Sequence, residues 1–444
     1  MVDILPILPK IDPLEELQKQ FCQFLFGGKI SIGRLTEIEQ ISSGERVDEI
    51  NMYSRLDGKL LMQCALEKLP VNCDVEQTIK MFMRHPDTLR YEQTSFSPKA
   101  CRSNTLNYWV PPIIKLESGD CREIIHFLKT VICRRNRAVF MYLIMYLAHM
   151  WQKPEEKPGV AIVLLGGQGT GKGTFFQLLA NIWTRTTLQV SSVEHIVGGF
   201  NAAMERNLII NMDEALFSGD RRAIDRLKSM ITEPTITIEQ KYQPRRTVDS
   251  IHSFFAASNH QHFGNIEKDD RRFVFLRLSE ERKADHKYFN DIHGAISDAT
   301  QLAAFASLLA TLDITKFNIR SKPNTGELIE QKLQSLRGFE RFWYEVLCIG
   351  DLDFSDLHAP QPWQESMFIS TKSLTAAYEK HARKYRQYDS IQSTEIKKGL
   401  PVWCPDAHEK RKKAGNEHRR GYQLPHIDLA RENFEEAIGG KVDW

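Results

Sequence analysis

The apolar positions of the chain change their spacing along its length. Between about residues 159 and 278, short continuous apolar runs such as VAIVLL, NLIINM and SFFAA alternate with helical patterns. Runs of this length between helical segments are typical of buried parallel strands. We therefore predict an α/β fold with a parallel sheet in this region, followed by a helical stretch to about residue 350.

The flanking regions give coarser predictions. Helical spacing predicts helices at residues 13–26, 76–84, 122–133 and 138–152, with an extended, proline-containing connector at 97–119. In the last part of the chain we expect a helix from residue 370, a short helix at 394–398, a strand around Val402, and a strand at 421–425 after a basic run.

Composition narrows the class of protein. The 444 residues, 42% hydrophobic and 26% charged, are typical of a globular protein of about three domains. A net charge of +2 excludes a generic polycation, so any nucleic-acid site must be local. Apolar runs are too short to cross a bilayer, and the eight scattered cysteines include no CxxC pair. We expect no membrane segment, no zinc site and a cytoplasmic location in a bacterial host cell.

A glycine-rich loop follows the predicted strand at residues 160–165. Gly166, Gly171 and Lys172 fit the pattern G-x-x-x-x-G-K ahead of a helix. In this context glycines let backbone N–H groups surround phosphates, and the lysine reaches the terminal phosphates. The predicted nucleotide-binding residues are Gly166, Gly167, Gln168, Gly169, Thr170, Gly171, Lys172, Gly173 and Thr174.

One position departs from this pattern. Gly173 stands where a Ser or Thr hydroxyl normally binds magnesium. Either the metal is held through water and a downstream acid, or Thr174 replaces the missing hydroxyl. The sequence GKGT also resembles the loop of adenylate kinases, which makes a nucleotide kinase a competing hypothesis.

Two later strand ends carry further candidate residues. Asp213 and Glu214 follow one strand, where the first carboxylate could hold Mg²⁺ and the second could act as the base for an attacking water. Asn259 follows another strand, and its amide could sense the γ-phosphate. Arg271 and Arg272 are either structural ion-pair partners of neighbouring aspartates or an arginine finger for an adjacent subunit.

Two basic segments are candidates for DNA contact. A hairpin is predicted at 231–248, with Lys241, Tyr242, Arg245 and Arg246 around its tip. The basic run near the C-terminus supplies six more candidates: Lys410, Arg411, Lys412, Lys413, Arg419 and Arg420. For both segments a solvated charged surface is the alternative.

Together GGQGTGKGT, NLIINMDEA, the hairpin segment, FFAASNH and DDRRF resemble the ATPase core of superfamily 3 helicases, and more narrowly phage, plasmid and poxvirus-type primase-helicases. The resemblance implies a P-loop AAA+ core at 156–350, a helical collar at 96–155 and a winged helix at 351–444, with 1–95 unassigned. It also implies a homo-oligomeric ring, expected to be a hexamer, with ATP and Mg²⁺ as cofactors.

In that family the hairpin projects into the ring channel and the arginine finger acts between subunits. The resemblance therefore implies a DNA helicase or translocase for replication of a phage, plasmid or integrated element, with possible primase, origin or replication partners. An ATP-switched origin-binding or assembly protein remains the alternative, with a nucleotide kinase as a weaker one. The first 95 residues show no clustered acids, so we expect no primer synthesis.

Overall fold

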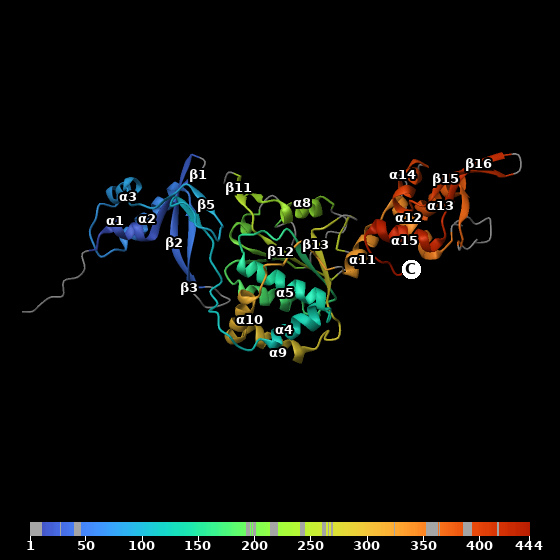
Figure 1. Cartoon of the computed structure of the whole chain (residues 1–444). Helices are drawn as coiled ribbons and strands as arrows, with labels where there is room; N and C mark the ends of the chain where they lie inside the picture. The colour runs from blue at the N-terminus through green and yellow to red at the C-terminus, as the bar shows by residue number, and fades with distance from the viewer. Residues whose placement is uncertain are drawn as a thin grey trace, which may run out of the picture. The chain divides into compact units, whose positions relative to one another are not determined.

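A computed structural model of the 444-residue chain describes most of its residues and separates them into two units. The described residues are 11–26, 28–39, 46–191, 196, 198, 201–213, 221–239, 245–259, 263–264, 266–267, 270–323, 325–351, 363, 365–384, 393–414 and 417–444. One unit comprises residues 1–111 and 236–249, and the other comprises 112–235 and 250–444. Figure 1 labels the elements used below.

The N-terminal residues form a small sheet with helices packed on it. The strand order is β3-β2-β1-β4, and β1 pairs antiparallel with β2 but parallel with β4. A second small sheet pairs β5 with β6. The elements are α1 (Pro13–Gln20), β1 (Phe21–Phe26), β2 (Lys29–Glu39), β3 (Arg46–Tyr53), α2 (Arg55–Glu67), α3 (Val75–Arg84), β4 (Arg90–Tyr91), β5 (Gln93–Ser95) and β6 (Thr105–Asn107).

The predicted helix at residues 13–26 is wrong in its second half. The helix α1 is capped by Asp12, whose carboxylate accepts the Leu14 N–H at 2.8 Å, and it ends at Gln20. Phe21 and the residues that follow pair with β2 instead. Phe21 and Phe24 are fully buried in the cores on this sheet, so tertiary packing overrides the helical spacing.

The predicted parallel sheet is confirmed. Its order is β13-β7-β12-β9-β8, and neighbouring strands pair in parallel throughout. All residues of β7, β9 and β12 are buried, as expected for strands covered on both faces. The strands are β7 (Ala161–Leu165), β8 (Thr187–Val190), β9 (Ile209–Met212), β12 (Ser253–Ser258) and β13 (Phe273–Arg277).

Helices flank this sheet. α5 packs against α10, and α9 contacts α4, α6 and α10; in Figure 1 α4, α5, α9 and α10 are labelled below the strands and α8 above them. The predicted helices at 122–133 and 138–152 are confirmed, the first with a π-helical second half. The helical elements are α4 (Arg122–Phe127), η1 (Leu128–Ile132), α5 (Arg137–Gln152), α6 (Lys172–Ile182), η2 (Ala202–Arg206), α8 (Arg221–Thr232), α9 (His286–Ser297) and α10 (Ala299–Thr311).

Between α8 and β12 the chain forms a separate two-stranded sheet of β10 (Thr235–Ile238) and β11 (Arg246–Asp249). This is the pairing predicted for residues 231–248. Lys241 and Tyr242 lie outside the described residues.

The C-terminal residues form an α+β module with its own aromatic core, which includes Trp343, Trp363, Trp403 and Phe434. Its antiparallel sheet has the order β14-β16-β15. The elements, including the preceding α11, are α11 (Gly326–Ser335), α12 (Gly338–Ile349), β14 (Met367–Ser370), α13 (Thr371–Lys384), α14 (Ser393–Trp403), β15 (His408–Ala414), β16 (Glu417–Leu424) and α15 (Ile427–Ile438).

The predicted strand around Val402 is wrong, because Val402 belongs to α14. Ile396, Leu400 and Trp403 recur at helical spacing and are buried in the aromatic core. The helix therefore continues past Pro401, and the strand begins at His408.

Candidate functional site

The glycine loop joins β7 to α6, and its backbone conformation requires glycine at two positions. Gly169 and Gly171 have φ angles of +75° and +101°. A Cβ atom on Gly171 would also lie 2.9 Å from the Phe289 ring and 3.2 Å from the Phe127 ring. The left-handed backbone and this close approach fix the turn from which α6 begins at Lys172.

The Lys172 ammonium lies inside the loop. The residue is 8% exposed, and its Nζ donates hydrogen bonds to the carbonyl oxygens of Gly166 at 2.6 Å and Gly167 at 2.7 Å. The Thr170 hydroxyl donates to the same Gly167 carbonyl at 2.8 Å. The side chain is thus held at the N-terminal turn of α6, where the helix dipole also favours an anion.

A cavity of about 410 Å³ brings together three of the predicted motifs. Its lining includes the loop, with Lys172 and Thr174, as well as Asp213 and Asn259. These residues meet because β12, which ends before Asn259, pairs in parallel with both β7 and β9, so all three strands end at one edge. Asp213 is fixed there by its N–H, which donates to the Val190 carbonyl at 2.9 Å. Glu214 lies outside the described residues.

Two further residues of this cavity come from α9. Phe289 and His293, four positions apart on the helix, line it together with the loop residues. The segment before α9 also contacts the loop, since the Ala284 N–H donates to the Gly169 carbonyl at 3.3 Å. No sequence motif marks Phe289 or His293 as a site residue, and their i,i+4 spacing is the local signal that relates them.

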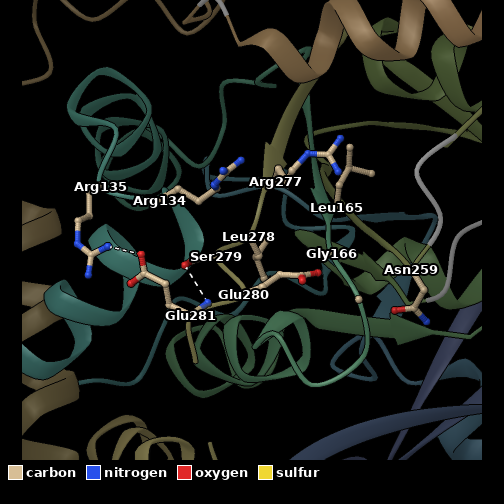
Figure 2. A pocket seen from close by; sticks show the side chains of 11 residues that line it. Arg134, Arg135, Leu165, Gly166, Asn259, Arg277, Leu278, Ser279, Glu280 and Glu281 are labelled. Carbon is tan, nitrogen blue, oxygen red and sulfur yellow. Dashed lines mark hydrogen bonds and ion pairs between the residues drawn. The ribbon is translucent and has the colours of Figure 1, made fainter. Parts of the chain in front are cut away.

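A second cavity, of about 650 Å³, lies beside the first and shares Asn259 with it. Figure 2 shows the ion pair of Arg135 and Glu281 at one end and Asn259 at the other. The Arg135–Glu281 distance is 2.7 Å, and this arginine lowers the pKa of the Glu281 carboxyl. Arg134 and Arg277 also line the cavity. Arg134 and Arg135 have positive φ angles of 47° and 58°, which are uncommon for non-glycine residues.

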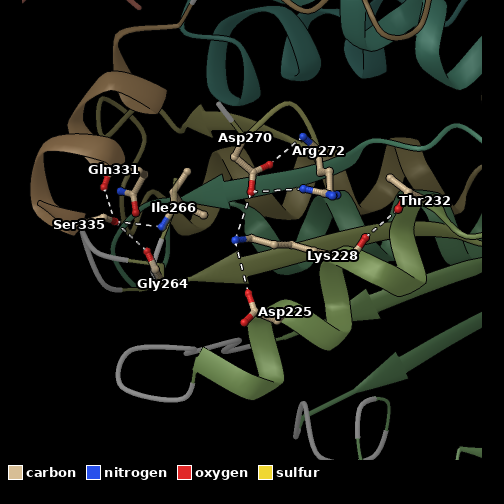
Figure 3. A network of polar contacts seen from close by, with 9 residues as sticks. All are labelled: Asp225, Lys228, Thr232, Gly264, Ile266, Asp270, Arg272, Gln331 and Ser335. Atoms are coloured by element: carbon tan, nitrogen blue, oxygen red, sulfur yellow. Dashed lines mark hydrogen bonds and ion pairs between the residues drawn. The ribbon is translucent and has the colours of Figure 1, made fainter. Parts of the chain in front are cut away.

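The two candidate finger arginines have different surroundings, and Figure 3 shows those of Arg272. Arg272 faces the buried Asp270. The backbone N–H of Arg272 donates to Oδ1 of Asp270 at 2.9 Å, and its guanidinium lies 4.0 Å from Oδ2. The buried Lys228 on α8 lies 3.4 Å from the same carboxylate. Arg271 is exposed. The ion-pair reading therefore describes Arg272, and Arg271 is the more accessible of the two.

The residues predicted to contact DNA differ in their exposure and in their hydrogen-bond or ion-pair partners. Arg245 is exposed and pairs with Glu239 at 3.0 Å, and Arg246 begins β11. In the C-terminal module, Lys410 donates to the Gln423 side chain at 3.1 Å. Lys413 is exposed on β15.

The antiparallel register of β15 and β16 places like charges directly opposite each other. Arg411 stands opposite Arg420, and Lys412 stands opposite Arg419. Opposed residues share a face of the sheet and successive pairs alternate faces, so the two pairs lie on opposite faces. Arg411 and Arg420 line a cavity of about 430 Å³ with Lys397 of α14.

The described residues contain neither a membrane-spanning helix nor a grouped set of metal ligands. No helix in this part of the chain is long and apolar enough to cross a membrane. Within the same residues, no three His, Cys, Asp or Glu side chains are grouped so that they could hold a metal ion.

The chain is similar to one family model and to a phage protein. A family model described as a family of unknown function, DUF5906, matches residues 164–272, which run from the end of β7 to Arg272. The DNA primase-polymerase of Nitratiruptor phage NrS-1 is 28% identical over 192 residues, covering 42% of this chain. These residues make up 26% of that protein, so the chain spans about a quarter of the relative's length.

The similarity of fold extends much further than the similarity of sequence. An apo structure of the NrS-1 C-terminal region has a TM-score of 0.66 at 17% identity, covering 94% of this chain and 100% of that one. A second apo form has a TM-score of 0.65 at 18% identity, covering 93% and 100%. The chain therefore shares the fold of this region over nearly its whole length.

Proposed function

We propose that this chain is an ATP-hydrolysing DNA translocase or helicase that acts in replication of a phage, plasmid or integrated mobile element. The observation that carries the proposal is the single cavity lined by the glycine loop, Lys172, Asp213 and Asn259. A phosphate-binding loop, a carboxylate and an amide at one edge of a parallel sheet are the groups that nucleotide hydrolysis needs. The similarity to a phage DNA primase-polymerase supports the replication role.

Each group has a proposed task at the ATP site. Lys172 and the loop N–H groups bind the phosphates, Asn259 senses the γ-phosphate, and Glu214 is the base by its position after Asp213. The strand order supports this assignment, because β12 lies between β7 and β9 and so brings Asn259 beside both Lys172 and Asp213. It is also the basis for proposing a P-loop AAA+ core.

The donor set of the cavity fits Mg²⁺. Asp213 and Thr174 both line it, and the hard oxygen ligands that a carboxylate and a hydroxyl offer suit this ion. When bound, Mg²⁺ would neutralise phosphate charge.

Gly173 offers a test of this ligand role, because a Cβ atom there meets nothing within 4 Å. Thr174→Val should raise the Mg²⁺ concentration needed for half-maximal hydrolysis, and adding Gly173→Ser should reverse that rise; an unchanged requirement in Thr174→Val contradicts the ligand role.

DNA binding is proposed for two regions. The order α12, β14, α13, α14, β15, β16 fits a winged helix, with the basic β15–β16 hairpin as its wing. The β10–β11 pair, with Lys241, Tyr242, Arg245 and Arg246, would contact DNA in a ring channel.

The ring itself, proposed to be a hexamer, would bring Arg271 of one subunit to the ATP site of the next. Mixing tests this arrangement. Lys172→Ala subunits and Arg271→Ala subunits, each inactive alone, should regain part of the hydrolysis when combined, because some sites then join an intact loop to an intact finger. No recovery from any mixing ratio contradicts a finger at Arg271.

The experiment that tests the function measures ATP hydrolysis and unwinding of forked DNA by the wild type and Glu214→Gln. We expect hydrolysis and unwinding in the wild type, and nucleotide binding without hydrolysis in the variant. Hydrolysis without unwinding would favour the ATP-switched assembly protein. Phosphate transfer from ATP to AMP would favour the nucleotide kinase, and undiminished hydrolysis in Glu214→Gln would remove that residue from its role.

A further inference from the structure

The β10–β11 pair begins and ends at one point of the larger unit. The chain leaves that unit after Thr235 and returns to it at Ser250. Its two ends are joined there, because the Ser250 N–H donates to the Pro234 carbonyl at 2.8 Å. Any movement of the pair must pass through this base.

Lys157 binds both sides of the base. Its Nζ donates to the backbone carbonyls of Met230 at 2.7 Å and Glu233 at 2.6 Å, where the chain leaves α8. It also donates to the hydroxyl of Ser250 at 2.5 Å, where the chain returns. The three acceptors use all three protons of the ammonium. Lys157 itself lies just before β7, the strand that leads into the glycine loop.

The contacts continue from Ser250 into the sheet. Its hydroxyl lies 2.9 Å from Nδ1 of the fully buried His252, and Nε2 of His252 lies 3.0 Å from the Met204 carbonyl. Since the carbonyl can only accept, Nε2 carries the ring proton and the Ser250 hydroxyl donates to Nδ1. The hydrogen bonds therefore run in one direction, from Lys157 through Ser250 and His252 to Met204.

Taking the Lys157 ammonium out of water costs desolvation free energy. The ammonium is partly withdrawn from water, and its hydrogen-bond acceptors are carbonyl and hydroxyl oxygens. Burial lowers the pKa of Lys157 to about 8, a shift that the nearby Glu233 partly offsets. A half-buried ammonium whose hydrogen-bond acceptors are neutral is better explained by a need for fixed geometry than by net stabilisation.

We propose that Lys157 is a positioning residue that clamps the base of the β10–β11 pair to the strand of the glycine loop. The inference rests on the proposed function, in which the pair contacts DNA and the loop binds ATP. Lys157 would transmit a change at one to the other, because its ammonium is hydrogen-bonded to both sides of the base and the residue lies four positions before β7. Without it, the ATP site would work but would not respond to DNA.

The test compares Lys157→Met with Lys153→Met, which removes the same charge from an exposed side chain four residues earlier. We expect Lys157→Met to keep the basal rate of ATP hydrolysis and the affinity for nucleotide. Its rate should rise less than about 1.5-fold when DNA is added, whereas the wild-type rate rises several-fold. Lys153→Met should match the wild type. Lys157→Arg keeps a charged donor and should recover part of the stimulation.

A second readout does not depend on activity. Hydrogen exchange of the Ser250 amide and of β10 and β11 should be at least about 10-fold faster in Lys157→Met than in the wild type. If Lys157→Met does not fold, Ser250→Ala removes one acceptor and should give the same change at a smaller size. Unchanged exchange, or full DNA stimulation in folded Lys157→Met, overturns the proposal. If the wild type hydrolyses no ATP, the proposed function fails, and the exchange result alone decides whether Lys157 holds the base.

Discussion

The cations of the parallel-sheet region and those of the β15–β16 hairpin have opposite surroundings. Lys172 and Lys228 are buried and meet fixed oxygen atoms, namely loop carbonyls and the Asp270 carboxylate. Arg411 and Arg420 are exposed, stand directly opposite each other, and have no ion-pair partner among the described residues. In the parallel-sheet region each of these cations is fixed by specific oxygen atoms, whereas on the β15–β16 hairpin the cations lie together on an exposed surface.

The difference predicts two kinds of response to mutation. Where a cation meets fixed acceptors, removing one side chain should cause a large and specific loss. Where like charges face each other across strands, they destabilise the fold until an anion neutralises them, so the losses should follow the number of charges and the salt concentration.

The largest effect is expected at the glycine loop. Lys172→Ala should reduce ATP hydrolysis by about three orders of magnitude, because the cation that contacts the terminal phosphates is lost. Steady-state phosphate release measures it, with Lys316→Ala, an exposed lysine, as the control. A loss below about 10-fold would contradict the role of the loop and remove the contrast with the hairpin.

The buried ion pair should give the next largest effect. Lys228→Met removes the ammonium that lies 3.4 Å from the buried Asp270 carboxylate and leaves Arg272 at 4.0 Å, so the free energy of unfolding should fall by about 3 kcal/mol. Urea denaturation measures the change. Lys228→Met with Asp270→Asn should recover much of it, since the buried charge is removed, while the exposed Arg271→Ala should change little. Equal stability of the wild type and Lys228→Met would contradict the pair's role.

Acid should weaken the network at the base of the β10–β11 pair. Burial lowers the pKa of His252 from 6.5 to about 4, so between these values the unfolded chain binds a proton that the folded chain does not. Stability therefore falls as the pH drops from 6.5 towards 4, by about 2 to 3 kcal/mol from this residue. Burial also lowers the pKa of His149 and His381. Urea denaturation of His252→Gln isolates its share, and an unchanged pH dependence in that variant contradicts the prediction.

The two faces of the β15–β16 hairpin should give the smallest effect. Arg411→Ala/Arg420→Ala and Lys412→Ala/Arg419→Ala remove the same charge from opposite faces. The first pair, which lines a cavity with Lys397, should lower DNA affinity about 10-fold and reduce the salt slope by about 2, and the second should lower affinity less than about 3-fold. Titration of labelled DNA at several salt concentrations measures both. Equal losses would mean that charge alone matters.

Sequence patterns predicted the residues of the site that directly follow buried strands. The glycine loop, Asp213 and Asn259 each follow an apolar run, and parallel strands bring their C-terminal ends to one edge. The alternation of short apolar runs and helices also predicted the parallel sheet. In these cases the conformation that the local pattern favours is also the one that tertiary packing stabilises.

The remaining features depend on contacts between distant segments. Lys157 meets Met230 and Ser250, and Phe289 meets Gly171, without a local motif that marks them. The segment after Gln20 was predicted as helix because Phe21 and Phe24 are three positions apart, which is a helical spacing. In the structure this segment pairs with β2 as a strand, and the two rings are buried in different cores. Such outcomes follow from packing, which a single sequence does not display.

The most direct test of the central claim is the rate of ATP hydrolysis measured as single-stranded DNA is added to the wild-type chain. Our account predicts Mg²⁺-dependent hydrolysis that rises several-fold to a plateau with DNA and is absent in Lys172→Ala. Hydrolysis that is absent at every DNA concentration, or equally fast in Lys172→Ala, would contradict it.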